Sequence, residues 1–225
     1  MPAKLTISRA LWDAKGLDLV IFELVAVVLS TAVGVQPPIQ ANMLTTTNKG
    51  KLCFFMDSNR TGTLSIVATP IGNLSDMVPR AVQTLQSADL IACEDTRHSK
   101  KLLDHFGIKT SCIAYHDHGD RKILDKLLAK LVEGQHIALI SDAGTPLISD
   151  PGYRLVAEAR SRGINVLPIP GACAAIAALS VAGLPTDRFY FGGFLPVKNS
   201  QRQSALSKYK NLVETLIFYE APHRI

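Results

Sequence analysis

Short apolar runs alternate with amphipathic stretches from residue 64 to residue 219, and this alternation predicts an α/β fold. Runs such as 64–68, 90–93 and 136–140 have the length and composition of strands buried within a parallel sheet. Between them, the apolar residues of 121–132 recur at the spacing of one helix face. Repeated strand and helix units predict a parallel sheet that is flanked by helices and joined by right-handed crossovers.

The remaining elements follow from the same pattern and from glycines that end helices. The predicted strands are 64–68, 90–93, 112–114, 136–140, 164–167, 188–191 and 215–219. The predicted helices are 76–85, 97–106, 121–132, 152–162, an alanine-rich segment that ends at Gly183, and 201–210.

This pattern predicts a division into three parts. Residues 63–170 form one α/β domain, and residues 171–225 begin a second α/β domain that we expect to be incomplete at its C-terminus, because a helix should start where the chain stops. Residues 1–62 differ from the rest of the chain in their pattern of apolar and polar positions. We expect them to be a poorly ordered extension or the result of a mis-assigned start, with the functional protein beginning near Met56. The apolar stretch 19–35 faintly resembles a signal peptide or a membrane span, but Glu23 interrupts it.

Composition narrows the function only slightly. A hydrophobic content of 47% supports a sizeable core, and the formal charge of +5 is too small to indicate nucleic-acid binding by itself. The four cysteines follow no metal-ligand or disulfide spacing, so we expect reduced thiols and no structural metal.

Residues 141–152 directly follow an apolar strand and contain two aspartates, two prolines and two glycines. The carboxyl ends of parallel strands are where open α/β sheets bind ligands. Gly144 and Gly152 permit close backbone approach, whereas Pro146 and Pro151 stiffen the loop. The pattern therefore indicates a ligand site over a plain connector, with Asp150 expected to cap the next helix.

Other polar clusters also follow predicted strands, and common nucleotide motifs are missing. No GxGxxG, P-loop, HExxH or GxSxG sequence follows any strand, which disfavours ordinary dinucleotide binding and the commonest methyltransferase fold. Several strand ends that contribute to one crevice are typical of an α/β enzyme site. The clusters are 69–73, 94–98, 116–120, 141–152 and 220–224.

Taken together, these stretches resemble the ribosomal RNA small subunit methyltransferase I family, which has the tetrapyrrole-methylase fold. The resemblance begins near residue 64 and continues to the end, whereas the first sixty residues find no place in it. One departure is Ala172, where the family commonly has proline; this change could alter cofactor affinity. The matching stretches are 67–74, 94–98, 116–118, 141–152, 183–185, 187–189, 193–196, 218–220 and 223–224.

The resemblance implies a cytoplasmic, homodimeric enzyme with no membrane partner. It implies methyl transfer from S-adenosyl-L-methionine to the ribose 2′-hydroxyl of a cytidine in the decoding region of 16S rRNA, within the small ribosomal subunit. It also implies that the cofactor lies between two α/β domains. By analogy the cofactor-binding residues are Pro70, Ile71, Gly72, Asp142, Ala143, Gly144, Thr145, Pro170, Gly171 and Ala172.

Methyl transfer to a ribose hydroxyl needs two well-positioned reactants and a group that takes the hydroxyl proton. Carboxylates and an imidazole at the strand ends are candidates for that catalytic group, namely Glu94, Asp95, His116 and Glu220. The segment 94–97 could instead be a capped helix start with its own ion pair. Arg97, His118 and Arg224 are candidates for holding phosphate or ribose, so they are the predicted substrate-binding residues.

Two other functions stay open from the residues. A C-methyltransferase that acts on a tetrapyrrole would share the fold, although such proteins usually carry a glycine-rich turn where this chain has 69–73. A non-catalytic remnant that binds cofactor or ribosome would follow if the second domain lacked its last strands.

Overall fold

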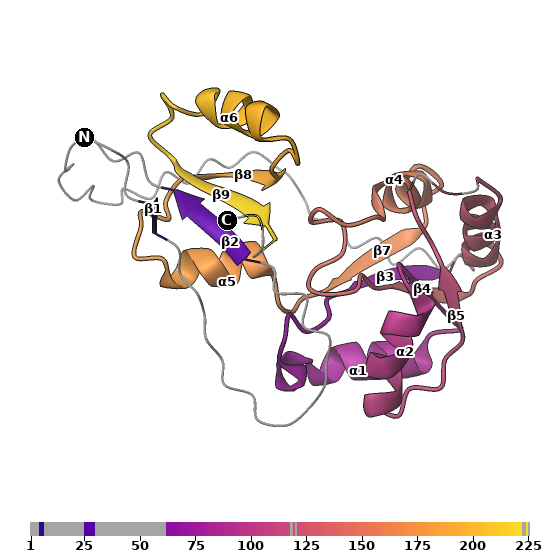
Figure 1. Ribbon diagram of the computed structural model, residues 1–225. Coiled ribbons are helices and arrows are strands. Elements are labelled where there is room, and N and C mark those ends of the chain that lie inside the picture. Colours follow the sequence, from indigo (N-terminus) through magenta and orange to yellow (C-terminus); the bar gives the residue numbers. More distant parts are fainter. Residues whose placement is uncertain are drawn as a thin grey trace, which may run out of the picture.

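A five-stranded parallel sheet forms the centre of the larger lobe in the computed structural model, which describes residues 5–6, 25–29, 62–117, 119, 121–221 and 224. Its order is β5-β4-β6-β3-β7, and the lobe that contains this sheet lies on the right in Figure 1. The strands are β3 (Thr63–Val67), β4 (Leu90–Cys93), β5 (Cys112–Ala114), β6 (His136–Leu139) and β7 (Asn165–Ile169). Every pairing is parallel, so the predicted sheet type is confirmed.

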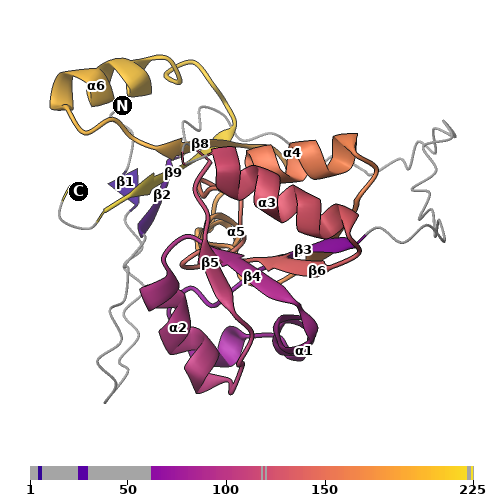
Figure 2. The ribbon, with the colours of Figure 1, turned by 90° about the vertical axis from the view of Figure 1, so that its right-hand side faces the viewer.

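Helices cover both faces of this sheet, in pairs. On one face lie α1 (Pro79–Ser87) and α2 (Thr96–His105), and on the other lie α3 (Arg121–Val132) and α4 (Tyr153–Ser161) (Figure 2). Two separate apolar clusters result, one under each helix pair. The apolar strands are therefore buried from both sides, which explains their nearly continuous apolar sequence.

The strand order gives the sheet a topological switch point between β6 and β3. The chain leaves β3, passes over the position of β6 to reach β4 and β5, then returns to β6 and finally crosses β3 to reach β7. The connections to β4 and β5 therefore run in one direction from this point, and the connection to β7 runs in the other. Open α/β sheets bind ligands at their carboxyl edge, at the ends of the strands beside such a switch point. The predicted polar clusters at 69–73, 94–98 and 141–152 all follow strands at that edge.

A smaller lobe contains a second sheet of order β1-β2-β9-β8. The strands β8 (Phe189–Phe194) and β9 (Thr215–Glu220) are parallel, whereas β2 (Val25–Leu29) pairs antiparallel with β9 and with β1 (Leu5–Thr6). The helices α5 (Ala174–Val181) and α6 (Asn199–Ser207) lie on opposite sides of this sheet (Figure 1). The boundaries predicted at residues 62 and 170 stay predictions, as does the nature of residues 1–62.

Two sequence predictions fail locally, for reasons of backbone geometry. The helix expected from residue 76 is instead a short 3-10 helix, η1 (Leu74–Asp76), followed by an extended Val78 and by α1. Pro79 occupies the first helical position, and its ring drives the preceding residue out of the helical region. Asp150 does not cap α4, because the cap position is Gly152, with a φ of 136°.

Within the described part of the chain, no helix is both long enough and apolar enough to cross a membrane. Most of the apolar stretch 19–35 lies outside the described residues.

Candidate functional site

Three turns from three strands meet at the carboxyl edge of the first sheet. Thr69, after β3, exchanges two backbone hydrogen bonds with Gly144 in the loop after β6, at N···O distances of 2.9 and 3.1 Å. In the same loop, the Thr145 hydroxyl donates to the Ala172 carbonyl, after β7, at 2.9 Å. The structure thus brings together the turns containing Gly72, Gly144 and Ala172 that were predicted to hold the cofactor.

Small residues are required where these turns touch. A Cβ added at Gly144, whose φ is 84°, would lie 3.2 Å from Ile71 Cγ2, and one at Gly171 would lie 2.9 Å from Ala68 Cβ. At Gly72, with a φ of 133°, the added atom would meet nothing within 4 Å. Tight packing behind the turns and open space at Gly72 leave backbone groups accessible, which suits a flexible ligand such as S-adenosyl-L-methionine.

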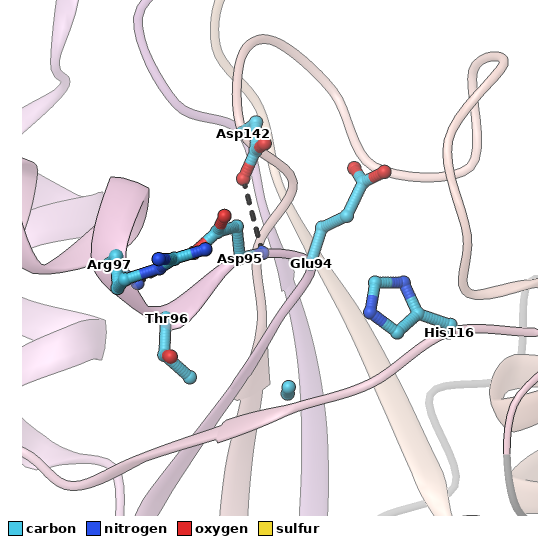
Figure 3. A pocket seen from close by; sticks show the side chains of 7 residues that line it. Glu94, Asp95, Thr96, Arg97, His116 and Asp142 are labelled. Carbon is cyan, nitrogen blue, oxygen red and sulfur yellow. Dashed lines mark hydrogen bonds and ion pairs between the residues drawn. The ribbon is translucent and has the colours of Figure 1, made fainter.

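A pocket of about 420 Å³ lies beside these turns, at the ends of β4, β5 and β6. Figure 3 shows Glu94 and His116 on one side of this pocket and Thr96 and Arg97 on the other. We call this cavity the acidic pocket, because three carboxylates line it. Its lining residues are Glu94, Asp95, Thr96, Arg97, Ala114, His116 and Asp142.

The two carboxylates that follow β4 have different surroundings. Asp95 is the N-cap of α2, and its Oδ1 accepts from the amides of Arg97 and His98 at 2.7 and 3.3 Å. These two hydrogen bonds, first that from Arg97, lower the pKa of Asp95. The capped helix start that the sequence offered as an alternative is therefore confirmed for Asp95. Its carboxylate is occupied by hydrogen bonds from the first amides of α2.

Glu94 has the opposite electrostatic environment. Burial is the largest cause that raises the pKa of its carboxyl above the ordinary value, and the nearby charge of Asp142 raises it further. Asp142 is fixed at the end of β6, where its Oδ1 accepts from the Asp95 amide at 3.3 Å. The raised pKa makes the Glu94 carboxylate a stronger base than an ordinary glutamate, although the nearby His116 partly opposes the rise.

Asp150 is a third perturbed carboxyl in the same loop. Burial chiefly raises its pKa from the ordinary 3.8 to about 6, against a hydrogen bond from Ser141, and the charges of Glu94 and Asp142 add to the rise. Glu94, Asp142 and Asp150 together make the local electrostatic potential more negative. A negative potential favours a cationic ligand such as a sulfonium. Among the described residues, no group of His, Cys, Asp and Glu is arranged to hold a metal ion.

We expect Asp150→Asn to stabilise the protein above about pH 6 and to change little below about pH 4. The folded protein binds the Asp150 proton more tightly than the unfolded chain, so stability present at low pH is lost as the pH rises through about 6. Since the group is half-exposed, we discount the full shift to about 1–2 kcal/mol. Thermal unfolding of both proteins across this pH range tests the expectation, and a constant difference between them would contradict it.

Asp117 holds the far end of the same loop and was missed by sequence reasoning. Its Oδ2 accepts from the amides of Gly152 and Tyr153 at 2.9 and 3.1 Å, and the Tyr115 hydroxyl donates to its Oδ1 at 2.9 Å. The Arg154 guanidinium donates a hydrogen bond to the Asp117 carbonyl at 2.7 Å. Asp117 therefore replaces the side-chain cap that Gly152 cannot supply, from 35 residues away.

We expect Asp117→Ala to lower the free energy of unfolding by about 1–3 kcal/mol, because it leaves several N-terminal amides of α4 without an acceptor. Urea unfolding measures this loss. Asp117→Asn keeps one acceptor oxygen and should lose less, and the exposed Asp187→Ala should stay within about 0.5 kcal/mol of the parent. Equal stability of Asp117→Ala and Asp187→Ala would contradict the capping role.

The other predicted residues are placed apart from the acidic pocket. Glu220 is buried at the end of β9, where its Oε1 lies 3.0 Å from Arg224 Nε and its Oε2 lies 3.6 Å from Arg202. Arg224 also donates to the Leu195 carbonyl at 2.9 Å. These contacts hold Glu220 and Arg224 together within the second lobe. The predicted substrate-binding residue His118 lies outside the described residues.

The two lobes meet next to the loop after β6. Gly193, in β8, would place an added Cβ 3.4 Å from the Ser149 hydroxyl. Tyr219, in β9, accepts a hydrogen bond from the Ala175 amide at the start of α5, at 3.2 Å. The turn containing Pro170 and Gly171 connects β7 of the first sheet to α5 of the second lobe. It lies beside the loop after β6, to which Ala172 is hydrogen-bonded.

Comparison with known proteins gives consistent results. Residues 63–225 match the family of tetrapyrrole (corrin/porphyrin) methylases. A protein named ribosomal RNA small subunit methyltransferase I from Escherichia coli O157:H7 is 58% identical over 167 residues, which cover 74% of this chain and 58% of that protein. The protein of the same name from Synechocystis sp. is 60% identical over 164 residues, covering 73% and 59%. The chain therefore spans less than two thirds of the length of these relatives.

A solved structure has a similar fold at low sequence identity. The crystal structure of diphthine synthase superposes with a TM-score of 0.53 and 17% identity, over 70% of this chain and 64% of that one. This likeness concerns the arrangement of strands and helices alone.

Proposed function

Because this chain belongs to the tetrapyrrole (corrin/porphyrin) methylase family, we propose that it is an S-adenosyl-L-methionine-dependent methyltransferase of small-subunit ribosomal RNA. More closely, we propose the ribose 2′-hydroxyl of a cytidine in the decoding region of 16S rRNA as the acceptor. The relatives' printed name supports the RNA substrate, and the sequence resemblance supports the finer choice of atom and nucleotide.

One observation carries this proposal: the convergence of three small-residue turns beside a pocket with a proton-accepting carboxylate. The turns containing Gly72, Gly144 and Ala172 are joined by backbone and hydroxyl hydrogen bonds, so they form one cradle for the cofactor. The acidic pocket adjoins it through Asp142, which belongs to both. Donor and acceptor molecules bound in these two places would be neighbours, and proximity can supply much of the rate of a transfer reaction.

Glu94 is our choice for the general base. Its carboxyl has a raised pKa and faces the pocket, whereas the carboxylate of Asp95 caps α2 and has a lowered pKa. When bound, S-adenosyl-L-methionine supplies a methyl group made electrophilic by the positive sulfur. Glu94 would accept the proton that the ribose hydroxyl loses, and His116, on the same side of the pocket, would orient the ribose.

The remaining predicted residues take supporting roles. Arg97 is 94% exposed at the pocket rim and is placed to bind a phosphate of the RNA. Glu220 and Arg224 form a buried ion pair, so their contribution in this chain is to hold β9 and the segment after it. We further propose that the protein acts in the cytoplasm as a homodimer.

The deciding experiment is a transfer assay with labelled S-adenosyl-L-methionine and small ribosomal subunits from a strain that lacks this gene. We expect label in the RNA, and an alkali-resistant dinucleotide with the methyl on a cytidine 2′-oxygen. Label in an added porphyrinoid precursor but not in RNA would instead favour a tetrapyrrole C-methyltransferase. No label in either substrate, with cofactor binding retained, would favour a non-catalytic binding protein. Light scattering during gel filtration tests the dimer.

A further inference from the structure

A second cavity lies beside the acidic pocket, along the exposed side of α2. Its volume is about 380 Å³, and Thr96 and Arg97 line both cavities. The walls of the two cavities are therefore continuous at the start of α2. We call this second space the basic cavity, for the charges described next.

Positive charge predominates in the basic cavity. Arg97, Lys100 and Lys109 line it, against the single carboxylate of Asp104. Arg97 and Lys100 are one helical turn apart, about 4.5 Å along the axis, so their side chains rise from the same side of α2. Lys100 and Lys109 are exposed, and in the part of the chain that the structure describes neither forms an ion pair.

The base of the basic cavity is apolar. Leu103 and Ile108 lie there and are 3% and 4% exposed, since both belong to the core under α1 and α2. The lysines therefore stand around a firm surface that is fixed by the packing of the sheet. A shallow charged rim over an apolar base suits a nucleotide, which carries an anionic phosphate next to less polar ribose and base surfaces.

The two cavities have opposite electrostatic character. Glu94, Asp95 and Asp142 line the acidic pocket, and their charges repel phosphate. An RNA strand that presents one ribose to the acidic pocket must place its phosphates elsewhere. The basic cavity is the adjoining space that attracts them, and Arg97 stands at the boundary between the two.

We propose that the basic cavity binds a phosphodiester group of the RNA strand, next to the nucleotide whose ribose enters the acidic pocket. Lys100 and Lys109 bind this phosphate, and Arg97 binds the one nearer the ribose. This assignment rests on the proposed RNA substrate and adds a site for the flanking nucleotide. The contacts position the strand and carry no base specificity.

A double variant, Lys100→Gln/Lys109→Gln, tests the assignment in the full chain. Its matched control is Lys126→Gln/Arg160→Gln, which removes two exposed positive charges from α3 and α4 on the opposite face of the sheet. The probes are small ribosomal subunits for methyl transfer and a short single-stranded RNA for binding over a range of salt concentrations. Calorimetry with S-adenosyl-L-methionine reports on the integrity of the cofactor site.

We expect the KM for RNA to rise roughly tenfold in the Lys100/Lys109 variant, with kcat and cofactor affinity unchanged. The slope of log affinity against log salt should fall by about 0.7, the usual value for one lost phosphate contact to a single strand, because both lysines bind the same phosphate. The control should keep the parental slope and KM.

The outcomes separate the two proposals. Equal slopes and KM values in the variant and its control would overturn the basic-cavity assignment, even if the parent methylates RNA. A parent that transfers no methyl to RNA would overturn the proposed function, whereas a reduced slope in the variant would still support the cavity as a phosphate site. Tighter binding of a phosphorylated peptide than of RNA by the parent would overturn the assignment to RNA.

Discussion

Glu94→Gln should lower kcat for methyl transfer by about 10²- to 10⁴-fold, the usual contribution of a positioned general base. Glutamine has nearly the same size and can still form hydrogen bonds, but it cannot accept the hydroxyl proton. The affinity for S-adenosyl-L-methionine should change little, because the turns that we propose to hold the cofactor belong to other strand ends. Single-turnover rates and calorimetry measure the two quantities separately.

Asp95→Asn is the matched control for this substitution. Asparagine is as good an N-cap as aspartate, so α2 should keep its start, and the loss of the Asp95 charge should reduce kcat by less than about tenfold. The reverse result, with Asp95→Asn far slower than Glu94→Gln, would move the base to Asp95. A loss of cofactor affinity as large as the loss of kcat in both variants would contradict a catalytic role for either residue.

The pH dependence gives an independent check on Glu94. A base must be ionised, so the rate should rise with pH through the raised pKa of Glu94. Asp142→Asn keeps an oxygen for the Asp95 amide but removes the charge that helps to raise this pKa. The rising limb should therefore shift to lower pH in Asp142→Asn, and an unmoved limb would contradict the assignment.

Local patterns predicted the elements of the first sheet well. The helix at 121–132 and the strands at 90–93 and 112–114 have the expected bounds, because each is defined by its own apolar spacing. The predicted start of α1 was wrong because apolar spacing does not reveal that Pro79 holds Val78 in an extended conformation.

Contacts between distant residues could not be read in the same way. Asp117 and Gly152 are 35 residues apart, and only the parallel pairing of the strands brings the carboxylate to the start of α4. The polar cluster at 116–120 indicated a contribution to a ligand site, but it did not indicate that one of its carboxylates would cap α4. Likewise, two adjacent carboxylates, Glu94 and Asp95, acquire opposite pKa shifts from burial and backbone amides that sequence alone does not reveal.

Gly144→Ala should weaken S-adenosyl-L-methionine binding by about 10- to 100-fold, which corresponds to about 1.4–2.8 kcal/mol. The added methyl would lie 3.2 Å from Ile71 Cγ2, so the turns after β3 and β6 must separate slightly. A left-handed backbone is also strained for alanine, at a cost of about 1–2 kcal/mol. Both effects act where the turns that we propose to hold the cofactor are joined.

Gly163→Ala separates these two effects. Gly163 follows the end of α4 with a φ of 72°, and an added Cβ there would meet nothing within 4 Å. It should therefore destabilise the protein by the backbone strain alone, about 1–2 kcal/mol, while leaving cofactor affinity at the parental value. If both variants bind the cofactor as the parent does, the junction of Thr69, Gly144 and Ala172 does not form the cofactor site, because the methyl group would have disturbed the turns without consequence for the ligand.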